Sequence, residues 1–170
     1  MTDDDTSIAD TSIAMRSFDA SLPMALLRAR EATMQYFRPL LADHGITEQK
    51  WRVLRALAAA PEPIEVSRLA EITALLPPSV SRIVARLNDD GMIERKVVPA
   101  DTRRSTLELT AEGRRFVGHV APHSEVVYEQ IEASFGKTRL AALLAELHDF
   151  VEITDKIDAD VESPAEESSP

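Results

Sequence analysis

The 170-residue sequence predicts a mainly α-helical protein with one small β-hairpin, and three observations indicate this fold class. Apolar residues recur at three- and four-residue spacing through most of the chain, as they do on the buried face of a helix. Glycine or proline interrupts these stretches at the expected helix ends. Only after Gly91 does the pattern change, to two short runs that are typical of paired strands. With 44% hydrophobic residues, the chain can bury a core.

The first two helices lie on either side of a short break at Gly45. Apolar residues from Leu22 to Leu40 predict a helix over about 21–43 that Gly45 ends. Thr47 is placed to cap the next helix, because its hydroxyl can accept a hydrogen bond from a backbone N–H of the first turn. The inner face of that second helix is expected to carry Trp51, Leu54 and Leu57.

A short third helix and a longer fourth helix follow Pro61 and Pro63. The third is expected to point Val66, Leu69 and Ala70 inward. The pair Pro77-Pro78 permits the start of the fourth, since proline suits only the first turn of a helix. The fourth helix then runs to about Asp90, with Val80, Val84 and Leu87 on its inner face.

The hairpin and two further helices complete the expected order α-α-α-α-β-β-α-α. Met92–Val98 and Ser105–Leu109 are the expected strands, and Pro99–Arg104 between them is expected to form an exposed loop. Thr110 caps a helix over about 111–134, and Gly136 separates it from a last helix over about 137–156.

The formal net charge of −10 is unevenly distributed. Residues 1–19 carry five acids against one arginine, and residues 158–170 carry five acids and no base. Both segments are predicted to be acidic, disordered tails. The stretch 78–104 carries six basic and four acidic residues, so a local positive face remains available to a polyanion despite the total charge.

Several classes of function are excluded by what the sequence lacks. The chain has no cysteine, which removes disulfides, thiolate metal sites and catalytic thiols. No apolar run approaches the roughly 20 residues of a membrane span, and the start lacks the features of a signal peptide, so we expect a cytoplasmic protein. No catalytic motif is present, and neither an enzyme nor a cofactor is expected. His119 and His123 could share a metal, but two exposed histidines are the default reading.

The order of elements over 65–109 is that of a winged helix-turn-helix, whose second helix enters the major groove of DNA. Ser79, Arg82 and Arg86 share one face of the fourth helix, and arginine can contact guanine or phosphate with two parallel hydrogen bonds. An ordinary amphipathic helix with solvated arginines remains the alternative interpretation.

The hairpin strengthens the nucleic-acid interpretation. Arg103 and Arg104 lie where a guanidinium could enter the minor groove, and Asp101 could hold Arg103 in place. Arg95 and Lys96 could reach phosphates. The alternative is a solvated turn with a surface ion pair, which contributes little energy.

These motifs together resemble the MarR family of regulators over residues 20–157. The resemblance rests on Leu69–Glu71, Ser79–Leu87, Asp90–Arg95, Asp101–Arg104 and Leu107–Thr110. It implies a homodimer that binds a pseudo-palindromic, double-stranded operator through a winged helix over 47–109, with Ser81 among the contacting residues. The helices over 20–43 and 111–157 would then form the dimerisation region.

Three upstream stretches are similar to the branch of this family that represses homoprotocatechuate degradation operons: Leu26–Ala32, Tyr36–Pro39 and Thr47–Val53. Two positions depart from the family pattern. Leu76 stands where a serine or threonine usually caps the recognition helix, a loss that typically costs about 1 kcal/mol. Ala74 stands where the turn usually has glycine.

The resemblance also implies a small aromatic acid or phenol as effector, bound between the dimerisation region and the DNA-binding lobe. Arg30 lies within an apolar stripe of the first helix, where a buried guanidinium needs an anion such as a ligand carboxylate. Phe37 and Trp51 would supply aromatic contacts, and Arg28 and His44 are lesser candidates. An ion pair within the protein is the alternative for Arg30, and Glu31 is the expected partner of Arg28.

The sequence therefore predicts a dimeric, ligand-responsive repressor of an aromatic-acid catabolic operon of the homoprotocatechuate or hydroxyphenylacetate type. A winged-helix module whose acidic tails bind a basic protein partner is the alternative.

Overall fold

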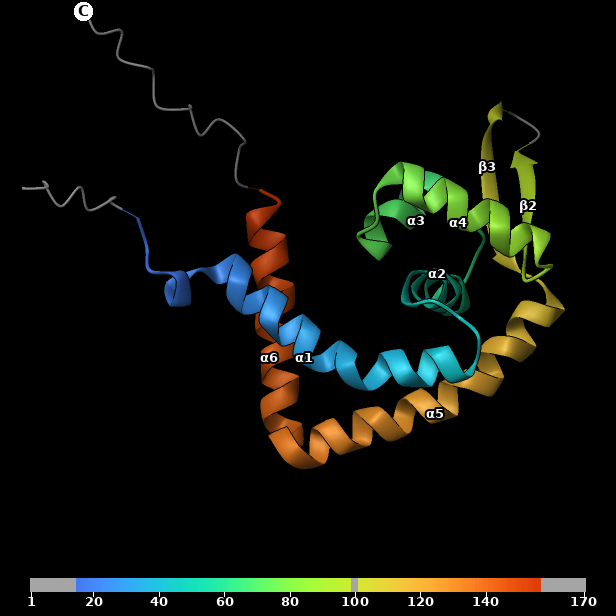
Figure 1. Cartoon of the computed structure of the whole chain (residues 1–170). Coiled ribbons are helices and arrows are strands. Elements are labelled where there is room, and N and C mark those ends of the chain that lie inside the picture. The colour runs from blue at the N-terminus through green and yellow to red at the C-terminus, as the bar shows by residue number, and fades with distance from the viewer. Residues whose placement is uncertain (1–14, 99–100, 157–170) are drawn as a thin grey trace, which may run out of the picture.

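The computed structural model describes residues 15–98 and 101–156, with only the backbone described at 98 and 101–104. Figure 1 shows a winged lobe at one end and a helical arm at the other. In chain order the elements are η1 (Phe18–Ala20), α1 (Leu22–Asp43), α2 (Glu48–Ala59), β1 (Ile64–Glu65), α3 (Val66–Thr73), α4 (Pro77–Asp89), β2 (Ile93–Val98), β3 (Asp101–Leu109), α5 (Ala111–Phe135) and α6 (Lys137–Thr154).

The winged lobe is built around α2. Figure 1 shows α3, α4 and the β2–β3 hairpin on one side of α2, with α1 and α5 on the other. Val53, Leu54, Leu69, Val80 and Leu87 are each fully buried in the core that joins these elements. The inward faces predicted for α2, α3 and α4 are therefore confirmed, except that Val66 is only partly buried.

The hairpin belongs to a three-stranded antiparallel sheet in the order β1-β3-β2. The sequence did not predict β1, whose two residues are too few to show a period; Ile64 pairs with Leu107.

The exposed loop expected over Pro99–Arg104 is a second error. β3 already begins at Asp101, which pairs with Val98. The register shifts between this pair and the pair Val97–Ser105, so residues 102–104 of β3 form an irregular stretch of the strand opposite β2.

Most helix ends follow the local signals in the sequence. Thr47 accepts a hydrogen bond from the Lys50 N–H, and Thr110 accepts one from the Gly113 N–H. Gly45 and Gly91 adopt left-handed φ values of 67° and 68° just beyond α1 and α4.

The turn between α3 and α4 forms despite its two unusual residues. Ala74 takes the left-handed conformation at φ 49°, and it alone among the described non-glycine residues has a positive φ. Leu76 occupies the N-cap of α4 and makes no side-chain cap hydrogen bond.

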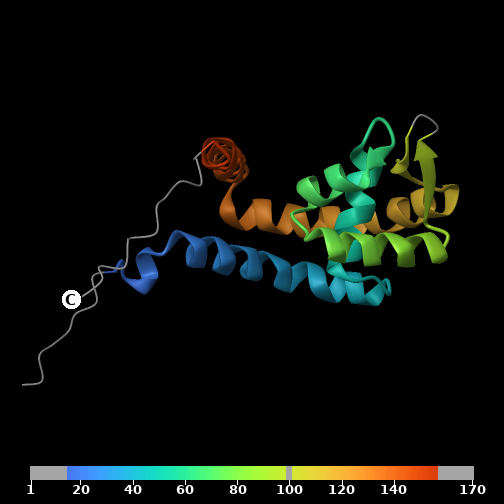
Figure 2. The same ribbon diagram turned by 90° about the horizontal axis from the view of Figure 1, so that it is seen from above.

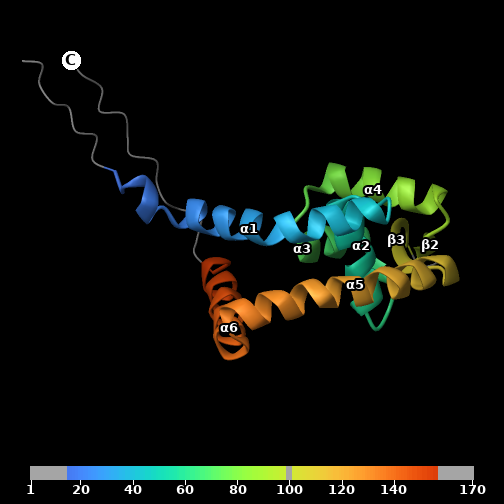
Figure 3. The same ribbon diagram turned by 60° about the horizontal axis from the view of Figure 1, so that its bottom comes forward.

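The helical arm consists of α1, α5 and α6. Helices α1 and α5 run antiparallel beside each other, and α6 turns sharply away at the far end of α5, as Figures 2 and 3 show from two further directions. No residue of α6 is buried, and Leu143, Leu144, Val151 and Ile153 are 44–62% exposed. Among the described residues, no helix is long and apolar enough to cross a membrane.

At the N-terminal end of the arm, Phe18 and Asp19 form part of η1, although the sequence assigned them to an acidic tail. Residues 15–17 of the predicted tail are described and exposed, and tail residues 1–14 and 158–170 lie outside the described residues.

Candidate nucleic-acid interface and ligand pocket

The outward face of α4 presents the guanidinium groups of Arg82 and Arg86 to solvent. Because Val80, Val84 and Leu87 are buried on the inner face, Arg82 and Arg86 project from the opposite side and are exposed. Neither arginine has an ion-pair partner among residues 15–98 and 101–156.

The two serines predicted to join Arg82 and Arg86 differ in their surroundings. Ser79 is half-buried, and the exposed Ser81 hydroxyl donates to the Pro77 carbonyl at 3.0 Å, within its own helix. Ser81 can still accept a hydrogen bond from outside the protein, because a hydroxyl keeps its lone pairs when it donates.

The basic residues of β2 are already engaged. Arg95 Nε donates to Ser105 Oγ at 2.8 Å. The Lys96 ammonium contacts the Glu108 carboxylate closely and Glu94 at 3.2 Å. The hydrogen bond to Glu108, followed by the one to Glu94, raises the pKa of Lys96 above its ordinary value of 10.5. Lys96 therefore has less unbalanced charge to offer a phosphate than the sequence suggested.

For the wing residues Asp101, Arg103 and Arg104 the structure fixes only the backbone. All three lie in β3, directly after the hairpin tip. Their side chains lie outside the described part of the chain, so the pinning of Arg103 by Asp101 stays a prediction.

A cavity of about 380 Å³ opens between the winged lobe and the helical arm. A volume of this size suits a small aromatic ligand. Helices α1, α2, α3 and α5 all contribute to its wall, which consists of Arg30, Thr33, Met34, Phe37, Leu41, Glu48, Trp51, Arg52, Arg55, Ala56, Ile72, Thr73 and Tyr128. Three of the predicted ligand residues, Arg30, Phe37 and Trp51, therefore lie together.

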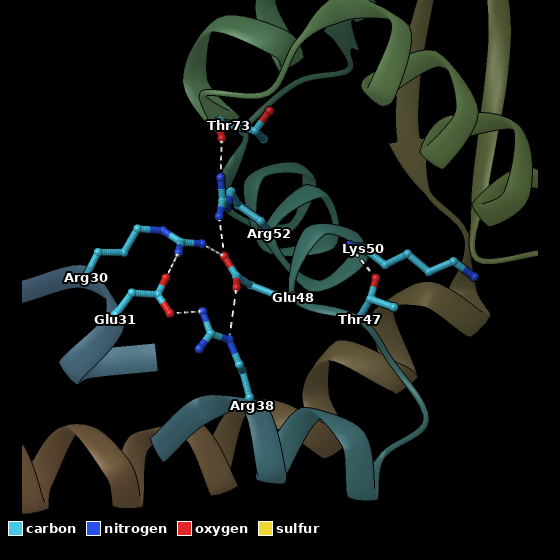
Figure 4. Close-up of polar contacts among 8 residues, drawn as sticks. All are labelled: Arg30, Glu31, Arg38, Thr47, Glu48, Lys50, Arg52 and Thr73. Atoms are coloured by element: carbon cyan, nitrogen blue, oxygen red, sulfur yellow. Dashed lines mark hydrogen bonds and ion pairs between the residues drawn. The ribbon is translucent and has the colours of Figure 1, made fainter. Parts of the chain in front are cut away.

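Arg30 does not occupy the buried position expected from its apolar stripe. Its side chain is 43% exposed and contacts two carboxylates, Glu31 at 2.5 Å and Glu48 of α2. Figure 4 shows that Arg38 also contacts both carboxylates. The hydrogen bond from Arg38 lowers the pKa of Glu31 below its usual range. The anions that pair with Arg30 are therefore the protein's own Glu31 and Glu48, and not the ligand carboxylate that the sequence predicted.

A second arginine, Arg55, lies in the same wall and was not predicted from the sequence. Arg55 Nη1 donates to the Tyr128 hydroxyl at 2.9 Å, and its guanidinium carbon lies 5.7 Å from the Tyr128 ring centroid. Unlike Arg30, Arg55 has no carboxylate partner within the described residues. The Tyr128 ring also packs against Phe37 at a centroid distance of 4.9 Å. The spacing of Trp51 and Arg55, four residues apart on one helix, was the signal that could have found it.

Arg28 lies away from this cavity. It pairs with Asp19 at 3.3 Å and lies over the Phe18 ring, so its expected pairing with Glu31 is wrong.

His44 is also not in the cavity wall. Its ring lies 5.3 Å from that of His119 and 4.9 Å from that of His123, between centroids. Despite this proximity, the described residues contain no group of three histidine or acidic side chains arranged to hold a metal ion.

Comparison with known proteins identifies related regulators. Residues 44–104 match the profile of the MarR family. The homoprotocatechuate degradative operon repressor of Escherichia coli is 36% identical over 141 residues, which cover 83% of this chain and 95% of that protein. The transcriptional regulator FarR of Neisseria gonorrhoeae is 33% identical, with 85% and 98% covered. The structure of NadR in complex with 4-hydroxyphenylacetate is 33% identical, with a TM-score of 0.73 and coverage of 83% and 99%.

Proposed function

The chain belongs to the MarR family, and we propose that it is a dimeric repressor that a small aromatic acid or phenol releases from a pseudo-palindromic operator. The proposed target is an aromatic-acid catabolic operon of the homoprotocatechuate or hydroxyphenylacetate type, and the proposed location is the cytoplasm. The relationship to an operon repressor and to a protein that binds 4-hydroxyphenylacetate supports this function. The single observation that carries it is the guanidinium of Arg55, without a carboxylate partner, in an aromatic cavity between two lobes.

Operator binding is proposed to use α4 and the wing. Inserting α4 into the major groove would bring Arg82 and Arg86 to bases or phosphates without first breaking an ion pair. The wing would place Arg103 near the minor groove. Lys96 is assigned a smaller role because Glu94 and Glu108 already balance its charge.

A second copy of the chain is proposed to cover the helical arm. Helix α6 leaves its apolar side chains uncovered, and α1 exposes Leu22 and Leu27 at 49% and 48%. Apolar surface of this extent is characteristic of an interface. A twofold dimer would also present two copies of α4 to the two halves of a pseudo-palindrome.

The effector is proposed to bind with its carboxylate at Arg55 and its ring against Phe37 and Trp51. A carboxylate matches the two-pronged donor geometry of a guanidinium. Tyr128 would keep Arg55 oriented, because its hydroxyl accepts the Arg55 hydrogen bond. The ligand would release DNA only if it binds the DNA-incompetent arrangement of the lobes more tightly than the competent one.

The test measures binding to the intergenic DNA upstream of the protein's own gene, by fluorescence anisotropy at several salt concentrations. Phenylacetate, 4-hydroxyphenylacetate, 3,4-dihydroxyphenylacetate and benzoate are then titrated into the complex. We expect affinity that falls steeply with salt and release by at least one acid. Trp51 is the only tryptophan, so its fluorescence reports binding directly. Salt-independent binding, or no release by any acid, would contradict the proposal.

Two variants, Arg55→Ala and Arg30→Ala, and one control identify the residue that binds the carboxylate. Arg55→Ala should abolish release, whereas Arg115→Ala, which removes an exposed arginine paired with Glu112 on α5, should behave as wild type. If Arg30→Ala loses release and Arg55→Ala retains it, the carboxylate binds at Arg30 instead.

A further inference from the structure

Glu48, the first residue of α2, joins two helices through its carboxylate. Its oxygens contact Arg30 and Arg38 of α1, the latter at 3.7 Å, and Arg52 of its own helix at 2.5 Å (Figure 4). The Glu48 side chain is only 20% exposed, so these contacts are less screened than ordinary surface pairs. Glu48 therefore balances the charge of the arginines on one side of the cavity.

Arg52 extends this network to α3. Its Nη1 donates to the Thr73 carbonyl at 3.0 Å, while its Nη2 donates to Glu48. The last carbonyls of a helix have no partner within the helix, and a cation there is favourable. One guanidinium thus connects the start of α2 with the end of α3.

Thr73 is the residue from which the helix-turn-helix turn departs. Its side chain is buried, and its hydroxyl donates back to Leu69 within α3. Ala74 follows in the left-handed conformation, and the Ala74 and Leu75 N–H groups bond to carbonyls of α3 at 3.1 and 3.2 Å. These hydrogen bonds attach the turn to the end of α3 directly before α4 begins.

The same residues face the proposed effector. Arg30, Glu48, Arg52 and Thr73 all line the cavity that contains Arg55. The network of Arg30, Arg38 and Arg52 with Glu31 and Glu48 holds one more positive than negative charge. An additional carboxylate in the cavity therefore competes with Glu48 for these guanidinium groups.

We infer that Arg52 is the positioning residue that couples the cavity to the DNA-binding helix. A carboxylate ligand weakens the Glu48–Arg52 pair, Arg52 loosens its hydrogen bond to the Thr73 carbonyl, and the turn before α4 shifts. This inference rests on the proposed function and deepens it, because it names the route by which the ligand acts. Arg52 acts through Thr73 and need not touch the DNA.

The first measurement is the ratio of operator affinities without ligand and with saturating ligand. Saturation makes the ratio independent of any change in ligand affinity. Couplings of this kind are typically about 5- to 150-fold, and we expect Arg52→Ala to bring the ratio close to one. Arg52→Lys should recover part of it, since a single ammonium cannot hold both partners as the guanidinium does. Arg115→Ala is the matched control and should keep the wild-type ratio. An unchanged ratio in Arg52→Ala would overturn the inference.

The second measurement needs no ligand. Hydrogen exchange should be faster at the Ala74 and Leu75 amides in Arg52→Ala than in wild type, with exchange in α6 unchanged. Glu48→Gln keeps the shape of the side chain but removes its charge, and it should bind the effector several-fold more tightly by Trp51 fluorescence. Unchanged exchange at the turn in Arg52→Ala, or an unchanged ligand affinity in Glu48→Gln, contradicts the route.

The two proposals fail in distinguishable ways. If wild type binds the operator but no acid releases it, the proposed effector class is wrong. Hydrogen exchange in Arg52→Ala then still decides whether Arg52 holds the turn. If an acid releases wild type and Arg52→Ala equally, the function stands and the route through Arg52 is rejected.

Discussion

Replacing Ala74 with glycine should stabilise the protein, although glycine inside structured elements usually has the opposite effect. Ala74 has a φ of 49° in the turn between α3 and α4. In this left-handed region the Cβ atom crowds the following carbonyl, which costs roughly 1–2 kcal/mol. Glycine removes that strain but loses about 0.5–1 kcal/mol more through its greater freedom in the unfolded chain. The midpoints of these two ranges differ by about 0.75 kcal/mol, which is the expected gain for Ala74→Gly.

The measurement is thermal and urea unfolding at one fixed protein concentration, because the stability of a dimer depends on concentration. The gain corresponds to a rise in Tm of about 1–4 °C for a chain of this size. Ala85→Gly is the matched control, since Ala85 is exposed in the middle of α4, and it should destabilise by about 1 kcal/mol. The two substitutions should therefore have opposite signs. If Ala74→Gly destabilises as much as Ala85→Gly does, strain at the turn is not the reason for its geometry.

Three further predictions follow from the interface, the arm and the ion pairs. Arg82→Ala should weaken operator binding by about 1–3 kcal/mol and relax the preference at one operator position in a competition assay, with Arg139→Ala on α6 as the control. Leu144→Asp should convert the dimer into a monomer in sedimentation equilibrium, because it places a charge in the proposed interface. The Arg38 hydrogen bond lowers the pKa of Glu31 from 4.5, so its stabilising contribution is present above that value and is lost as pH falls through the lower folded value. Glu31→Gln should accordingly flatten the acid side of the stability–pH curve below about 4.5, and an unchanged curve would contradict the pairing.

Features set by neighbouring residues could be predicted from the sequence. The caps at Thr47 and Thr110 and the glycine after α4 depend on chain segments of four or five residues, and all three appear where expected. Features set by distant segments could not. β1 exists only because Ile64 meets Leu107, and the length of the wing depends on how Val98 and Asp101 pair. No local pattern records such pairings.

The ligand site, too, could be predicted only in part, because its contacts join distant segments of the chain. Periodicity placed Arg30 in an apolar stripe, but it did not reveal that Glu48 would approach from α2 and that the side chain would stay 43% exposed. The spacing of Trp51 and Arg55 places both on one face of α2, but the contact that orients Arg55 could not be predicted, because its partner Tyr128 lies 73 residues away. Whether an arginine can bind a ligand carboxylate depends on which carboxylates of the protein already balance its charge. In the described structure Arg30 has two carboxylate partners, whereas Arg55 has the hydroxyl of Tyr128 as its partner. A ligand carboxylate that approaches Arg55 displaces no protein carboxylate from it, whereas one that approaches Arg30 must compete with Glu31 and Glu48. Arg55 is therefore the better candidate for the first contact with the ligand carboxylate. Arg30 contacts Glu48 and would take part in the change that follows ligand binding.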